Sequence, residues 1–159
     1  MTDAPTTYDY DELLLEAYNG ELFGNAIFSA MAARDEWRDH REALQLLAGI
    51  EDRTAAGLRP LVDAAGIDAG DGEEARRSGR ELGALGGSWD GFVKALFDAL
   101  PPFLANFARL REVAPDPHHP GIAALVAHEQ TISAFAQLEI GGFHDVSTAL
   151  LSRYLETAP

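Results

Sequence analysis

The sequence contains no cysteine, few basic residues and no long apolar run. Without cysteine there is no disulfide framework, no thiolate nucleophile and no sulfur-ligated metal. No apolar run approaches the roughly 18 residues that indicate a membrane-spanning helix, so we expect no membrane partner. The first residues, Met1 to Thr7, lack the basic flank and apolar stretch of a signal peptide, which favours a cytoplasmic location.

The scarcity of basic residues leaves a strongly acidic chain. Twelve lysines and arginines stand against 26 aspartates and glutamates, so the formal net charge is −14. A surface of this sign repels the phosphates of nucleic acids and anionic lipids, and it attracts metal cations. Nucleic acid is therefore excluded as an expected partner.

Length and composition predict a single all-α domain over residues 1–159. The chain is long enough for one compact core, and 47% of its residues are hydrophobic. Alanine, leucine and glutamate dominate, whereas valine, isoleucine and threonine are sparse, which favours helix over sheet. Without strands there is no place for the glycine-rich loops of nucleotide-binding folds.

Apolar periodicity and capping residues predict four long helices over residues 9–33, 36–65, 88–113 and 122–140. The third is expected to be interrupted at Pro101 and Pro102. A fifth, short helix is predicted over residues 146–155, and another short helix is possible over 73–85. The connections between the long helices are short, long and short, which is typical of an up-down four-helix bundle with one long crossover.

Three glutamates occupy positions where apolar residues are expected. When each helix is projected at about 100° per residue, Glu21, Glu51 and Glu129 lie in the middle of the apolar stripes of the first, second and fourth long helices. Each is also near the midpoint of its helix. In an antiparallel bundle the midpoints share one level, so we expect the three carboxylates to converge.

Converging buried carboxylates need a partner, because burying one costs several kcal/mol and three repel one another. A cation, shared protons or nearby hydrogen-bond donors would each serve. Tyr18, Thr54 and His128 are the auxiliary candidates. His128 precedes Glu129 and is expected to point about 100° away from it, toward a neighbouring helix and not at the centre of the cluster.

This placement of glutamates in a bundle with one crossover resembles the ferritin-like superfamily, which includes rubrerythrin-like and other di-iron carboxylate proteins. That superfamily carries a glutamate on its first and third helices and Glu-x-x-His on its second and fourth. Here Thr54 follows Glu51 and Ile132 follows Glu129 at the histidine positions, and the third helix offers no inward carboxylate. The resemblance therefore implies the fold together with an incomplete ligand set.

Two hypotheses follow. In the first, Glu21, Glu51 and Glu129 form an atypical site for a divalent metal, either iron or manganese, with magnesium or calcium as further possibilities. For such a site the resemblance implies redox chemistry on oxygen or on a small organic substrate. In the second, the chain is a metal-free relic of the fold that acts as a binding or interaction module. A homodimer and a small apolar ligand in the bundle core are the expected partners.

Overall fold

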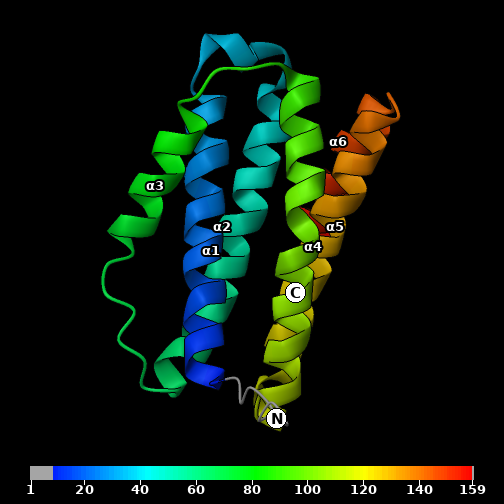
Figure 1. The fold of residues 1–159 in the computed structure, drawn as a ribbon. Helices are drawn as coiled ribbons and strands as arrows, with labels where there is room; N and C mark the ends of the chain where they lie inside the picture. The colour runs from blue at the N-terminus through cyan, green and yellow to red at the C-terminus, as the bar shows by residue number, and fades with distance from the viewer. Residues whose placement is uncertain (1–8, 159) are drawn as a thin grey trace, which may run out of the picture.

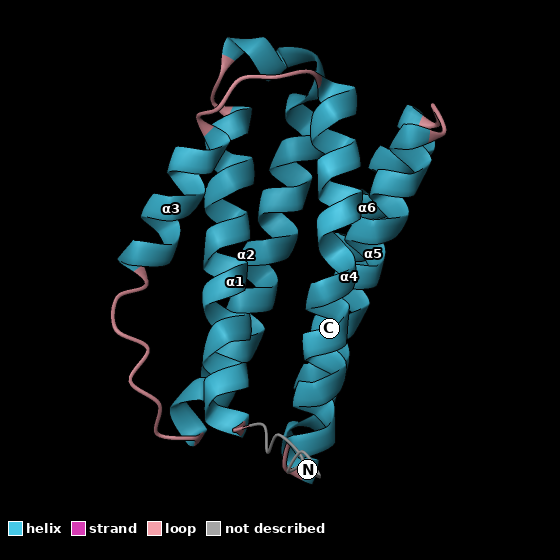
Figure 2. Cartoon of the chain, in the orientation of Figure 1, coloured by secondary structure: helices cyan, strands magenta, loops and turns pink. Residues whose placement is uncertain are grey.

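The computed structural model describes residues 9–158, and these residues form helices without any β-strand, which confirms the all-α prediction. In chain order the elements are α1 (Tyr10–Ala32), the 3₁₀ helix η1 (Asp35–His40), α2 (Arg41–Ala64), α3 (Glu73–Gly83), α4 (Trp89–Val113), the 3₁₀ helix η2 (Asp116–His118), α5 (His119–Ile140) and α6 (His144–Thr157) (Figure 2).

Four long helices, α1, α2, α4 and α5, lie side by side (Figure 1). Helix α1 contacts α2 and α4, and α5 contacts the same two helices, so the four surround a common interior. The contact between α1 and α4 is sparse compared with the contacts of the α1–α2 and α4–α5 pairs. Helix α6 packs on the outside against α5 and α2.

The connection from α2 to α4 runs along the outside of α1 from one end of the four helices to the other (Figure 1). Helix α3 is part of this connection and packs against α1, as the possible helix over residues 73–85 indicated. Two glycines allow the close approach. A Cβ atom on Gly83 would lie 2.6 Å from the backbone oxygen of Ile27, and one on Gly79 would collide with the backbone oxygen of Phe23.

Side-chain caps set the starts of α1 and α4. The side chain of Asp9 accepts a hydrogen bond from the backbone of Asp11, and Ser88 caps α4 in the same way. The second long helix was expected to begin at Glu36, but residues 35–40 form the 3₁₀ helix and α2 begins at Arg41. The extra 3₁₀ turns bring Trp37 into the core, where it is 3% exposed.

The expected interruption of the third long helix is wrong, because α4 continues through Pro101 and Pro102. A proline removes its own N–H and leaves the carbonyl four residues earlier without a helical partner. Both prolines lie on the exposed side of α4. Solvent can therefore satisfy the carbonyls of Phe97 and Asp98, and the helix persists.

Candidate metal centre

The interior of the four long helices holds two apolar clusters with a polar layer between them. One cluster gathers around Phe28, Leu47 and Phe135, and the other around Leu14, Leu58 and Leu125. The layer that separates them contains Glu21 from α1, Glu51 from α2, and His128 and Glu129 from α5. Their exposed fractions are 3%, 7%, 0% and 5% respectively, so all four side chains are buried at the midpoint of the helices.

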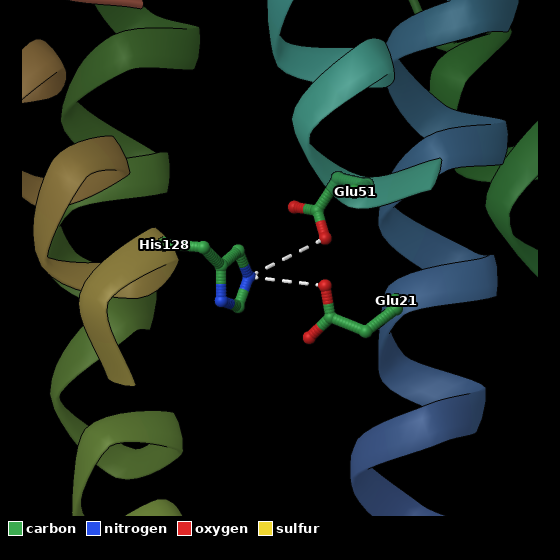
Figure 3. Close-up of side chains that lie close together, drawn as sticks. All are labelled: Glu21, Glu51 and His128. Atoms are coloured by element: carbon green, nitrogen blue, oxygen red, sulfur yellow. Dashed lines mark ion pairs between the residues drawn. The ribbon is translucent and has the colours of Figure 1, made fainter. Parts of the chain in front are cut away.

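The imidazole of His128 is surrounded by the three carboxylates. Its Nε2 atom lies 3.0 Å from Glu21 Oε2, 3.3 Å from Glu129 Oε2 and 3.6 Å from Glu51 Oε2. Figure 3 shows Glu21 and Glu51 reaching from neighbouring helices toward the same nitrogen. One ligand atom each from Glu21, Glu51 and His128 lie within 4.8 Å of one another, a spacing that one metal ion can bridge.

The opposite ring nitrogen fixes the orientation of this imidazole. Nδ1 of His128 faces the backbone oxygen of Leu125 in a short hydrogen bond. A carbonyl oxygen only accepts, so Nδ1 carries a proton, and in the neutral ring Nε2 presents its lone pair to the carboxylates. Metal-binding histidines commonly hold their second N–H in this way.

Two atoms of the cluster have no hydrogen-bond partner among the described residues: His128 Nε2 and Glu21 Oε2. The two atoms lie 3.0 Å apart and form an ion pair when His128 is protonated. Buried polar atoms in folded proteins are nearly always bonded, and an unbonded pair requires an explanation. Both atoms point to the same small volume, which is where a shared cation would lie.

A glycine makes room for the carboxylate of Glu51. Gly24 lies on α1, three residues after Glu21, and a Cβ atom there would stand 2.8 Å from both Cδ and Oε1 of Glu51. Only glycine lets the carboxylate lie this close to the α1 backbone. The sequence carried a signal for it, namely a glycine inside a helix on the same face as a predicted buried glutamate.

The clustered charges alter the protonation of these groups. Burial and the neighbouring Glu51 raise the pKa of Glu21 well above its ordinary value, although His128 opposes the shift. Burial also raises the pKa of Glu129 to about 7. Burial alone lowers the pKa of His128, but the adjacent carboxylates of Glu21 and Glu51 outweigh it and raise that pKa well above its usual range. The cluster therefore attracts either protons or another cation.

The structure brings Glu21, Glu51 and Glu129 together as the helical projection indicated. The expected orientation of His128 is wrong, because its Nε2 lies at the centre of the cluster. The ring is long enough to reach the centre from a position beside the apolar stripe of α5.

The hydrogen bonds of the other two auxiliary residues lead elsewhere. The Tyr18 hydroxyl bonds to the Arg59 side chain, and the Thr54 hydroxyl donates to the carbonyl of Ile50 at 2.9 Å. Within residues 9–158, neither hydroxyl forms a hydrogen bond with the four clustered side chains, so their role as auxiliary groups stays a prediction.

A second buried glutamate, Glu139, shows how a carboxylate is satisfied in this fold without a cation. It is 6% exposed and accepts hydrogen bonds from Trp89 Nε1 at 2.7 Å, from His144 Nδ1 at 2.6 Å and from the Ser147 hydroxyl. These donors join the start of α4 and the start of α6 to the end of α5. Sequence reasoning missed this residue, and its donors leave no oxygen without a partner.

No protein-family model, curated protein or solved structure matches the chain. The described helices include none that is both long and apolar enough to cross a membrane.

Proposed function

We propose that this protein is a ferritin-like helical bundle that binds one divalent metal ion through His128 Nε2 and the carboxylates of Glu21 and Glu51, with Glu129 beside them. The observation that carries the proposal is that two buried atoms, His128 Nε2 and Glu21 Oε2, face one space as an ion pair at 3.0 Å without a well-formed hydrogen bond. A cation there would satisfy both atoms and relieve the repulsion between the carboxylates.

The donor set favours manganese(II) or iron(II). Imidazole suits first-row transition metals, whereas carboxylates alone suit magnesium and calcium. The entry of His128 into the cluster therefore shifts the expected metal away from the hard cations that three carboxylates alone would select. Zinc(II) also accepts one nitrogen and two carboxylate ligands, so it belongs in the same titration.

The ferritin-like assignment is supported by the order of the helices and by the midpoint position of the glutamates. In that superfamily the histidine follows its glutamate by three residues. Here the single clustered histidine, His128, precedes Glu129. One imidazole and no contribution from α4 fit one metal ion better than two. Such an ion would supply Lewis-acid or redox chemistry, while the side chains of this chain would hold it and shield it from water.

Calorimetric titration of chelator-treated protein with manganese(II), anaerobic iron(II), zinc(II) and magnesium(II) tests the proposal. We expect near-stoichiometric binding of manganese(II) or iron(II), and a loss of at least about tenfold in affinity in Glu51→Gln and His128→Gln. The matched control is Glu139→Gln, which changes an equally buried glutamate outside the cluster and is expected to retain the metal.

The metal-free hypothesis predicts different results. If protons alone hold the cluster together, no metal binds and Glu51→Gln raises the melting temperature, because a buried charge has been removed. Absence of binding heat for all four metals, together with that stabilisation, would refute the metal site. Metal binding by wild-type protein should instead raise the melting temperature with increasing metal concentration.

A further inference from the structure

A cavity of about 560 Å³ lies between α1 and α4 and reaches the carboxylate cluster. Its inner end includes Glu21, Glu51 and Glu129, and the remaining lining is apolar apart from Glu16, Ser88 and Asn106. This volume is within the range of sites that hold small molecules, which are about 300–1,000 Å³. Neither the metal-binding glutamates nor the packing of the core requires a cavity of this size.

The cavity exists because small residues face each other across α1 and α4. Side chains this short cannot fill the space between two helices, so the sparse contact of this pair follows from the sequence. The facing small residues are Ala17, Gly20 and Gly24 on α1, and Gly91, Ala95 and Ala99 on α4.

The outer part of the cavity is lined by large apolar side chains that remain exposed. Leu82 at the end of α3 is 48% exposed, Leu85 in the following linker is 63% exposed, and Phe103 on α4 is 41% exposed, and all three line the cavity. Exposed apolar groups gathered around a hollow are typical of a binding site and not of scattered surface residues. They offer an apolar entry path to the cluster.

The charge of the inner end limits what can bind. In the metal-free protein an anionic head group would meet three carboxyl groups, and juxtaposed like charges are unfavourable. A cationic head group would have to leave water for an apolar channel and would find carboxylates that already face His128. An uncharged polar group avoids both costs, because it can hydrogen-bond to a carboxylate oxygen without carrying charge through the channel.

We propose that this cavity binds one uncharged, elongated and largely apolar molecule whose single polar end group lies against the carboxylate cluster. The apolar body contacts the facing small residues of α1 and α4, and the exposed leucines and Phe103 close over its outer end. The inference goes beyond the metal site, because the volume, lining and charge of the cavity are properties of the chain itself.

Three molecules with the same ten-carbon chain test the ligand class: 1-decanol, decanoate and decylammonium. Each is titrated into metal-free and manganese-treated protein by calorimetry, with intrinsic tryptophan fluorescence as a second readout, since Trp37 lines the cavity. In the metal-free protein we expect 1-decanol to bind, and decanoate to bind at least about tenfold more weakly. Equal or tighter binding of decanoate or decylammonium would overturn the proposed class.

A blocking variant and a matched control locate the site. Gly20 lines the cavity, and a Cβ atom on it meets no atom of the described chain within 4 Å, so Gly20→Phe places a ring in the space. Gly57 on α2 is equally open among the described residues but lies outside the cavity. We expect Gly20→Phe to weaken 1-decanol binding at least tenfold and Gly57→Phe to leave it unchanged.

A second blocking variant, Ala99→Phe from the opposite wall, covers the case in which Gly20→Phe does not fold, as judged by circular dichroism. Unchanged 1-decanol binding in a folded blocking variant would refute the assignment of the cavity. Metal binding by the same variants separates the two proposals. If Gly20→Phe retains manganese(II) and loses 1-decanol, both stand, whereas 1-decanol binding without any metal binding leaves only the cavity proposal.

Discussion

Two alanine substitutions one helical turn apart on α1 should differ in their effect on the metal site: one lowers the metal affinity and the other leaves it unchanged. Gly20 and Gly24 both lie in the helix interior, so replacing either with alanine adds about 1 kcal/mol of helix propensity. At Gly20 the new methyl group meets no described atom within 4 Å, but at Gly24 it would lie 2.8 Å from Cδ of Glu51. No real Cβ contact is that short, so the carboxylate must move.

The expected magnitudes follow from these contacts. Gly20→Ala should raise the melting temperature by about 2–4 °C and leave the metal affinity unchanged. Gly24→Ala should gain less stability, because the flexible end of a buried Glu51 side chain is displaced. Its metal affinity should fall about 10- to 100-fold, the usual effect of disturbing a group that orients a ligand.

The assay combines thermal unfolding of chelator-treated protein with calorimetric titration of manganese(II). Because both variants add the same methyl group to the same helix, a difference in metal affinity between them reports on Glu51 alone. The reasoning would be refuted if the two variants bound manganese(II) equally, or if Gly20→Ala lost affinity while Gly24→Ala retained it.

Two further predictions concern the rest of the fold. Gly79→Ala should detach α3 from α1, because its methyl group would collide with the backbone oxygen of Phe23; limited proteolysis should then cleave within residues 66–88 faster than in the wild type. Glu139→Gln should lower the free energy of unfolding at pH 7 by about 1–3 kcal/mol, because three donors lose a charged acceptor, as urea denaturation would show.

The effect of Glu139→Gln should also depend on pH. Burial raises the pKa of Glu139, but the hydrogen bonds from Ser147, Trp89 and His144 outweigh it and hold that pKa below its ordinary value. Because the pKa of Glu139 is lower in the folded chain than in the unfolded chain, its charge stabilises the fold at pH values above the unfolded-state pKa of about 4.3. This stabilisation is lost as the pH falls through the folded-state pKa. The difference between wild type and variant should therefore shrink below about pH 4.

The Gly79→Ala prediction has a matched control, and both predictions have a contrary outcome. Gly57→Ala adds a methyl group where no described atom lies within 4 Å, so it should leave the proteolysis rate unchanged. Equal cleavage of Gly79→Ala and Gly57→Ala would argue against the close α3–α1 contact. A stability difference for Glu139→Gln that is the same at pH 7 and pH 3 would show that the charge of Glu139 contributes nothing.

Much of the fold could be predicted from the sequence because the signals are local. The caps at Asp9 and Ser88 depend on residues within one turn of the chain. The same holds for Gly66 and Gly141, which follow the second and fourth long helices. The 3₁₀ turns before α2 were missed, since they are set by the burial of Trp37 against residues distant in sequence. The continuity of α4 was missed because the exposure of Pro101 and Pro102 depends on which side of the helix faces the core.

The sequence by itself determined that three glutamates share one level, because periodicity and helix length fix both the direction and the height of each side chain. Only the tertiary structure decided that His128 joins them, since its reach to the centre depends on how α5 is rotated against α1 and α2. The packing of α1 against α2 placed Gly24 beside Glu51, and the sparse packing of α1 against α4 left a cavity between them. These features arise from contacts between helices, which the pattern within any single helix does not contain.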